Sequence, residues 1–149
     1  MVIAKQLLKI AAGLSFAVAI FQAVISFSPS WSLYFGAPEE FTSSPLILLI
    51  GGLIVAVIFV VFGLYALAGA GYIHSLPLLR LGLLGIGSVY TLRGLFIIPV
   101  LLIMTGVLQV SDVLPPQALA SSLVSLLIGL VYLAGTILGW RELPLRIKD

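Results

Sequence analysis

The sequence contains no cysteine and a single histidine, His74, in 149 residues. The lack of cysteine excludes disulfide bonds, thiolate metal sites and a cysteine nucleophile. One histidine cannot supply a bis-histidine haem or a multi-histidine metal site within one chain. We therefore expect no metal ion and no other cofactor, and we interpret His74 as a solvated loop residue.

Charged residues are also scarce, at 8% of the chain, whereas 62% is hydrophobic. Ordinary globular chains are roughly 45–50% apolar and about 25% charged, so this composition indicates lipid rather than water as the solvent. The net charge of +2 gives no reason to expect nucleic acid as a partner. We expect membrane lipids as the surroundings of the chain.

Four apolar segments are long enough to cross the roughly 30 Å of hydrocarbon in a bilayer as α-helices. They predict one transmembrane domain over residues 1–149, with helices near 7–27, 45–70, 78–105 and 117–140. Ser44-Pro45 is a typical helix start. The first segment resembles a signal peptide in layout, but no small-x-small cleavage site follows it, so we expect it to be retained.

The third segment is too long for an upright span, because it stays apolar from Pro77 to Leu108. It must tilt, bend near Pro99 or project beyond one face of the bilayer. Pro99 cannot donate a backbone hydrogen bond, which frees the carbonyl near residue 95.

Basic residues indicate the orientation of the four spans. Six of the seven fall at the same end, namely Lys5, Lys9, Arg80, Arg141, Arg146 and Lys148. The loops at the other end hold Glu39, Glu40 and Asp112. Because cytoplasmic loops carry the excess of lysine and arginine, we expect an all-α, up-down-up-down four-helix bundle in the plasma membrane, here a bacterial inner membrane, with both termini cytoplasmic.

The first outer loop is rich in aromatic residues between Trp31 and Phe41. Amphipathic rings gain by partial burial at headgroup depth, so we expect this loop to fold back rather than extend into water. A partner-docking surface is the alternative interpretation.

Small residues recur along the predicted helices, and Gly135 and Gly139 form a GxxxG motif in the fourth. Helices in lipid associate closely where small residues let their backbones approach. We expect these residues to pack the four helices of one chain together, with formation of a homo-oligomer as the alternative.

Arg93 is the one charged residue deep inside a predicted span, about thirteen residues or roughly 20 Å along the helix from Arg80. A central arginine costs on the order of 2.5–3.5 kcal/mol on insertion scales. No carboxylate lies inside a span, so we expect Arg93 to be buried with hydrogen bonds to Gln22, Tyr90, a freed carbonyl, or Glu39 and Glu40.

Two roles for Arg93 remain open from the sequence. It could brace the third helix against its neighbours, or it could bind an anion, a carboxylate ligand or a lipid phosphate. For the second role we predict a ligand site formed by Arg93, Tyr90, Thr91 and Gln22.

Sequence motifs of enzymes are missing: there is no HExxH, GxSxG or phosphate-binding glycine loop, and no serine has a histidine at helical spacing. We therefore expect a non-enzymatic protein, a binding or accessory subunit that associates with lipid or a larger membrane protein. An oligomeric channel or transporter for a small anionic solute is the alternative, since four helices seldom enclose a pathway alone.

Overall fold

The structure is a computed structural model that describes residues 2–35, 37–107 and 116–143. Within those residues the regular secondary structure is entirely helical. Four helices are long and apolar enough to cross a membrane, Val2–Ile25, Pro45–Ala70, Leu79–Met104 and Leu119–Leu138. The predicted all-helical fold with four long apolar helices is confirmed.

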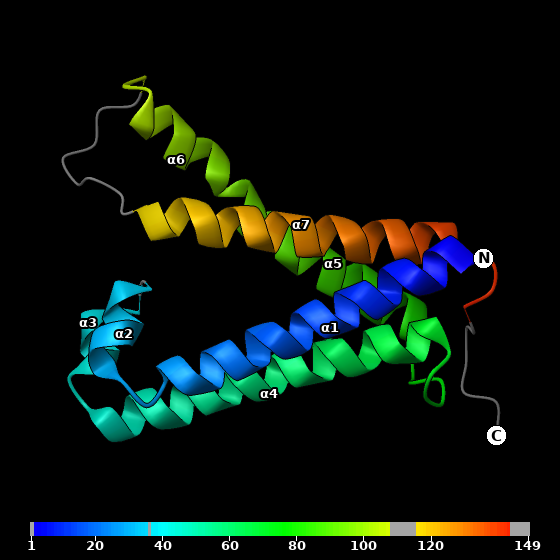
Figure 1. The fold of residues 1–149 in the computed structure, drawn as a ribbon, viewed down its shortest axis with the longest axis horizontal. Helices are drawn as coiled ribbons and strands as arrows, with labels where there is room; N and C mark the ends of the chain where they lie inside the picture. Colours follow the sequence, from blue (N-terminus) through cyan, green and yellow to red (C-terminus); the bar gives the residue numbers. More distant parts are fainter. Residues whose placement is uncertain (1, 36, 108–115, 144–149) are drawn as a thin grey trace.

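The helices follow one another along the chain as labelled in Figure 1, in the order α1 (Val2–Ile25), α2 (Pro29–Tyr34), α3 (Glu39–Thr42), α4 (Pro45–Ala70), α5 (Leu79–Leu95), α6 (Ile97–Met104) and α7 (Pro116–Leu138). Helix α4 has the predicted bounds. It starts with Pro45 after Ser44 in an extended conformation, and it ends at Gly71, whose φ of 83° is the left-handed conformation that glycine adopts without strain. The predicted loop before α7 lies largely outside the described residues.

Helix α1 begins at Val2, earlier than the expected start near residue 7. Ala4, Leu8 and Ala11 are buried and lie on one face, so the apolar stripe of the helix extends through its first turns. The side chain of Lys9 is exposed, and its Nζ lies 5.5 Å from the centre of the Tyr72 ring. Lysine at this end therefore does not interrupt the helix.

The long third segment is broken close to Pro99, which is one of the three possibilities that its length left open. It is divided at Phe96 into α5 and α6, and Pro99 lies in the first turn of α6. The Phe96 amide bonds the Arg93 carbonyl at 3.3 Å, one residue nearer than in an α-helix, and the Val100 amide bonds the Phe96 carbonyl at 3.4 Å. The missing amide hydrogen of Pro99 explains the break, because the Leu95 carbonyl has no α-helical donor.

Small residues mark the places where the long helices touch. At Gly94 an added Cβ would collide with the backbone of Leu126, which brings α5 and α7 into close contact. At Gly135 it would lie 2.9 Å from Leu8 Cγ, and at Gly139 it would lie 3.3 Å from Ala4 Cβ. The GxxxG motif of α7 therefore packs against α1 of the same chain, as predicted.

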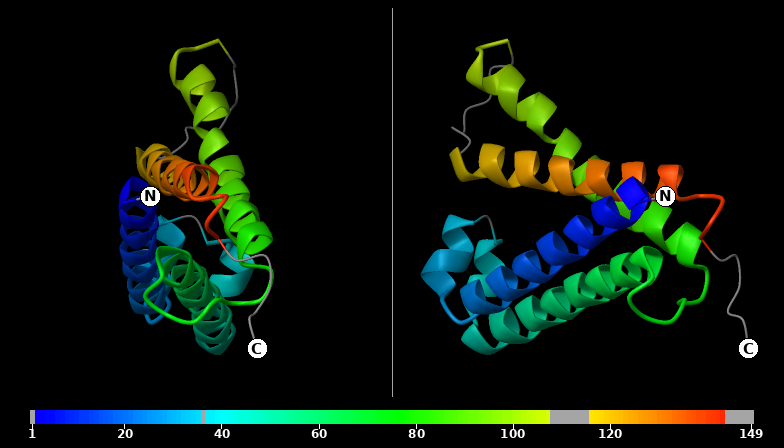
Figure 2. Two further views of the ribbon diagram at one scale, coloured as in Figure 1. Left: turned by 90° about the vertical axis from the view of Figure 1, so that its right-hand side faces the viewer. Right: turned by 45° about the vertical axis from the view of Figure 1, so that its right-hand side comes forward.

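Helix α1 lies along α4, and α5 crosses α7, with α1 also contacting α7 (Figure 1). The α1–α4 pair diverges from α7 toward the end of the molecule that carries α2 and α3, and Figure 2 shows the same opening from another side. Helix α6 continues away from α7 at that end. The tightly packed half of the molecule is thus the opposite one, where α1 starts and α7 ends.

The aromatic loop is folded into α2 and α3 rather than extended, as expected. The Phe35 ring packs edge-on against Phe21 of α1 with centroids 4.9 Å apart, and against Tyr34 at 5.1 Å. Trp31 is 60% exposed, and its ring centre lies 6.4 Å from that of Phe35. Helix α2 is therefore anchored to α1 by Phe35, while Trp31 remains on the surface.

Candidate functional site

A buried polar cluster lies between the four long helices, where the α1–α4 pair begins to diverge from α7. Tyr132 of α7 is fully buried, and its hydroxyl lies 2.7 Å from Ser15 Oγ of α1 and donates to the Phe62 carbonyl of α4 at 2.8 Å. Tyr90 of α5 stacks on Tyr132 with ring centroids 5.8 Å apart, and its hydroxyl lies 3.4 Å from Ser15 Oγ. One polar cluster therefore joins all four long helices at this level.

A cavity of about 600 Å³ adjoins this cluster at Tyr90, and its volume is within the size range of small-molecule sites. Its walls come from α1, α4, α5, α7 and the end of α2. The apolar wall residues are Val18, Phe21, Ile25, Phe35, Phe59, Pro116, Ala120, Val124 and Ile128, and the polar ones are Gln22, Tyr34, Tyr90, Arg93, Gln117, Ser121 and Ser125. The site is thus a mostly apolar cavity with one cationic side chain.

Arg93 is exposed, so the expectation that it is buried within the bundle is wrong. Among residues 2–35, 37–107 and 116–143, no acceptor binds its guanidinium and no carboxylate pairs with it. The reason is the position of Arg93 in the chain. Gly94 packs this turn of α5 against α7. Arg93, the residue before it, therefore borders the cavity at the level where the α1–α4 pair has diverged from α7. Within the described part of the chain, the guanidinium of Arg93 therefore borders the cavity without a partner.

Glu39 and Glu40 do not fold back onto Arg93 as suggested. Glu39 and Glu40 are exposed in the first turn of α3. Their backbone carbonyls accept hydrogen bonds from the Thr42 and Ser43 hydroxyls at 2.9 and 2.7 Å. The α3 helix therefore keeps its carboxylates outside the cavity.

Three of the four predicted site residues come together. Arg93, Tyr90 and Gln22 all line the cavity, although Gln22 belongs to a helix far away in the sequence. Thr91 does not line it: its hydroxyl donates to the Gly87 carbonyl at 2.7 Å, and the residue packs against Gly129 of α7. Thr91 therefore contributes to the packing of α5 against α7.

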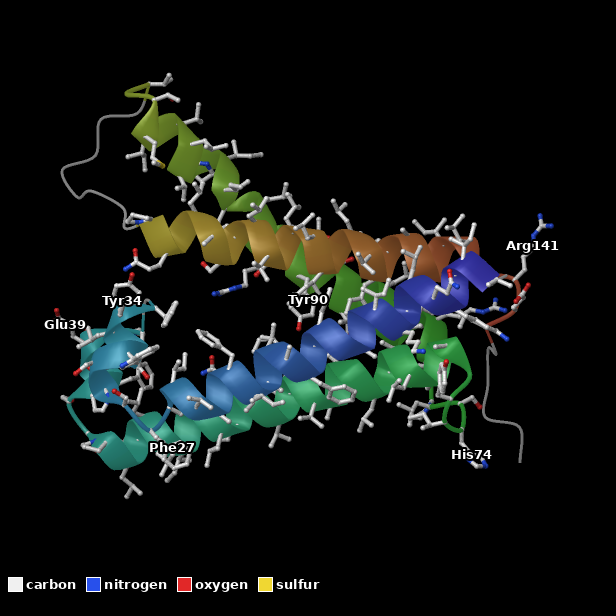
Figure 3. All side chains as sticks on the ribbon, in the orientation of Figure 1. Phe27, Tyr34, Glu39, His74, Tyr90 and Arg141 are labelled. Carbon is white, nitrogen blue, oxygen red and sulfur yellow. The ribbon has the colours of Figure 1, made fainter. Side chains whose placement is uncertain are left out.

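The outer edge of the cavity is bridged by a hydrogen bond between α2 and α7. The side-chain amide of Gln117 donates to the Tyr34 carbonyl at 3.4 Å. In Figure 3 the labelled Tyr34 and Tyr90 point into the space between the α1–α4 pair and α7, whereas His74 and Arg141 lie at the other end. The cavity therefore belongs to the end of the molecule opposite His74 and Arg141.

Sequence reasoning missed the contribution of α7. Ser121, Ser125 and Ile128 recur at helical spacing and line one side of the cavity. Ser125 is 7% exposed, and the structure shows no hydrogen bond from its hydroxyl to another described residue. The spacing of Ser121 and Ser125, four residues apart on one face of α7, was the feature of the sequence that could have indicated this part of the cavity.

Comparisons with protein-family models, with curated proteins and with solved structures find no match for this chain.

Proposed function

We propose that this protein is a non-enzymatic, four-span protein of the plasma membrane that binds an anionic ligand at Arg93, as a binding or accessory subunit. The observation that carries the proposal is the guanidinium of Arg93, which has no partner among the described residues and lies in the wall of a mostly apolar cavity. Arginine retains its charge and presents a rigid fork of donors that matches carboxylate and phosphate oxygens. A bound oxyanion would supply the negative charge that the described residues lack there.

A structural brace is the competing role for Arg93. A brace needs hydrogen-bond acceptors on a neighbouring helix, and the described part of the chain offers none within bonding distance of the guanidinium. Helix α5 is held to α7 by the contact at Gly94 instead. The packing of this turn therefore does not depend on the charge of Arg93.

The membrane topology in this proposal is up-down-up-down with both termini in the cytoplasm. It is supported by four candidate spans and by the position of the basic residues. Arg80 and Arg141 lie at the tight end of the molecule, and Arg80 Nε donates to the Leu143 carbonyl at 2.6 Å. Reporter fusions after residue 149 and within the α2–α3 segment test it: we expect cytoplasmic and periplasmic signals, respectively, and the reverse pattern would overturn the orientation.

The binding site is tested with Arg93→Gln, which removes the charge and keeps a hydrogen-bonding side chain. A ligand present at a hundred times its Kd stabilises the folded state by about 2.7 kcal/mol, so thermal unfolding in detergent should report binding directly. We expect anionic lipid to raise the Tm of the wild type and to lose most of that effect on Arg93→Gln.

Arg141→Gln is the matched control, since it removes one positive charge at the opposite end of the molecule. It should retain the lipid-dependent increase in Tm. If Arg93→Gln retains the increase in full, Arg93 is not the binding residue.

A further inference from the structure

A second, smaller cavity adjoins the first at Arg93. It has a volume of about 210 Å³ and lies between α4 and α5. Four residues line both cavities: Gln22, Phe59, Tyr90 and Arg93. The guanidinium, the Gln22 amide and the Tyr90 hydroxyl therefore stand at the junction of two compartments.

The smaller cavity is a crevice with apolar walls and an exposed rim. Besides the shared residues it is lined by Val55, Phe62 and Val89. Val55 is 37% exposed and Val89 is 55% exposed, and both lie in the middle parts of helices apolar enough to span a membrane. If these helices cross a bilayer, the rim of the crevice faces lipid chains rather than water.

Contacts between α4 and α5 locate the crevice beside the larger cavity. Near the tight end, Tyr65 of α4 packs against Gly82 of α5, and its hydroxyl donates to the Pro77 carbonyl at 3.3 Å. Farther along, the Phe59 and Tyr90 rings stack with centroids 5.9 Å apart. The crevice begins beside this ring pair, so that a molecule entering it would meet Arg93.

We propose that the ligand is a membrane-resident amphiphile with one acyl chain and a compact oxyanion head, a carboxylate or a phosphate monoester, and that it reaches Arg93 from the lipid through the α4–α5 crevice. This proposal rests on the proposed function and specifies the ligand of that site. The head binds at the polar junction, where Arg93, Gln22 and Tyr90 offer hydrogen-bond donors. The chain lies in the larger cavity.

The two volumes support this arrangement. The crevice has a volume of only about 210 Å³, whereas the larger cavity, at about 600 Å³, has room to enclose most of a drug-sized molecule. The larger cavity also carries apolar side chains that do not line the crevice, such as Val18 of α1 and Val124 of α7. A small soluble anion would pair with Arg93 but would leave these apolar walls without a partner.

Ligand class is tested with purified full-length protein and four probes: oleate, lysophosphatidate, butyrate and inorganic phosphate. Thermal unfolding is compared for the wild type and Arg93→Gln at equal probe concentrations. We expect oleate, lysophosphatidate or both to raise the Tm in a manner that depends on Arg93, and butyrate and phosphate to raise it by less than a quarter as much. Arg93-dependent binding of butyrate or phosphate as strong as that of oleate would overturn the amphiphile and leave the anion site intact.

A fifth probe, the two-chain lipid phosphatidylglycerol, is compared in the same way. Phosphatidylglycerol giving a larger Arg93-dependent increase than either single-chain probe would overturn the single chain. If no probe gives an increase that depends on Arg93, the proposed function itself fails.

Access through the crevice is tested separately by the rate of binding of a fluorescent fatty acid to protein in lipid nanodiscs. Val89→Trp fills the rim of the crevice, and Val55→Trp is a second variant from the facing helix. Val57→Trp is the control, because Val57 is 61% exposed on α4 and lines neither cavity. We expect at least a tenfold slower association for the two rim variants and an unchanged rate for Val57→Trp; equal rates in all three would overturn this route.

Discussion

Removing the Tyr132 hydroxyl should weaken the connection between all four long helices. Tyr132→Phe keeps the buried ring and its stacking on Tyr90, and it removes one oxygen that contacts Ser15 Oγ at 2.7 Å and the Phe62 carbonyl at 2.8 Å. Ser15 is then left with the longer 3.4 Å contact to the Tyr90 hydroxyl. The substitution therefore isolates two hydrogen bonds without creating a large cavity.

The magnitude follows from those two bonds. Hydrogen bonds contribute roughly 0.5–1.5 kcal/mol each in soluble proteins and about 0.6 kcal/mol on average between membrane helices. The Phe62 carbonyl lies in the interior of α4 and keeps its helical partner, so losing the bond from the Tyr132 hydroxyl does not leave this carbonyl unpaired and costs little further. We expect Tyr132→Phe to lower the free energy of unfolding by about 1–2 kcal/mol.

A double-mutant cycle with Ser15→Ala provides the measurement, using reversible unfolding in mixed micelles. The two substitutions should be non-additive, because each removes the same Ser15–Tyr132 bond. Tyr72→Phe is the control, since Tyr72 is 62% exposed and its hydroxyl lies outside this cluster. Strict additivity, or a loss no greater than that of Tyr72→Phe, would refute the cluster as a connection between helices.

Three further substitutions probe helix contacts. Gly94→Ala should lower stability by about 1–3 kcal/mol, because its Cβ would meet the Leu126 backbone, whereas Gly85→Ala, with no neighbour within 4 Å, should be neutral or slightly stabilising in the same thermal unfolding assay. Gly135→Leu should lower the Tm and leave the mass measured by light scattering unchanged, since Gly135 packs within the chain; a change from dimer to monomer would contradict this. Arg80→Lys should speed tryptic cleavage beyond α7, because lysine has no Nε–H group in the side-chain position that donates to the Leu143 carbonyl, and an unchanged cleavage rate would show that the bond is not needed.

The sequence by itself determined the four long apolar helices, because transfer of a segment from water to lipid depends on its local composition. It also determined the bounds of α4, whose start at Ser44-Pro45 and end at Gly71 depend on backbone preferences of neighbouring residues. Pro99 indicated a break near Phe96 as one of three possibilities, and the structure shows that break. Arg93, Tyr90 and Gln22 could be named as candidates because polar side chains in apolar helices are costly.

Only the tertiary structure decided which polar residues meet and which face open space. Ser15 and Tyr132 are 117 positions apart, and their contact depends on the rotation and crossing of α1 and α7, which are set by the fit of Gly135 against Leu8. Arg93 was expected to be buried, but the divergence of the α1–α4 pair from α7 leaves it exposed at the junction of two cavities. Local hydropathy cannot predict this, because the opening depends on how far each pair of helices stays in contact along its length.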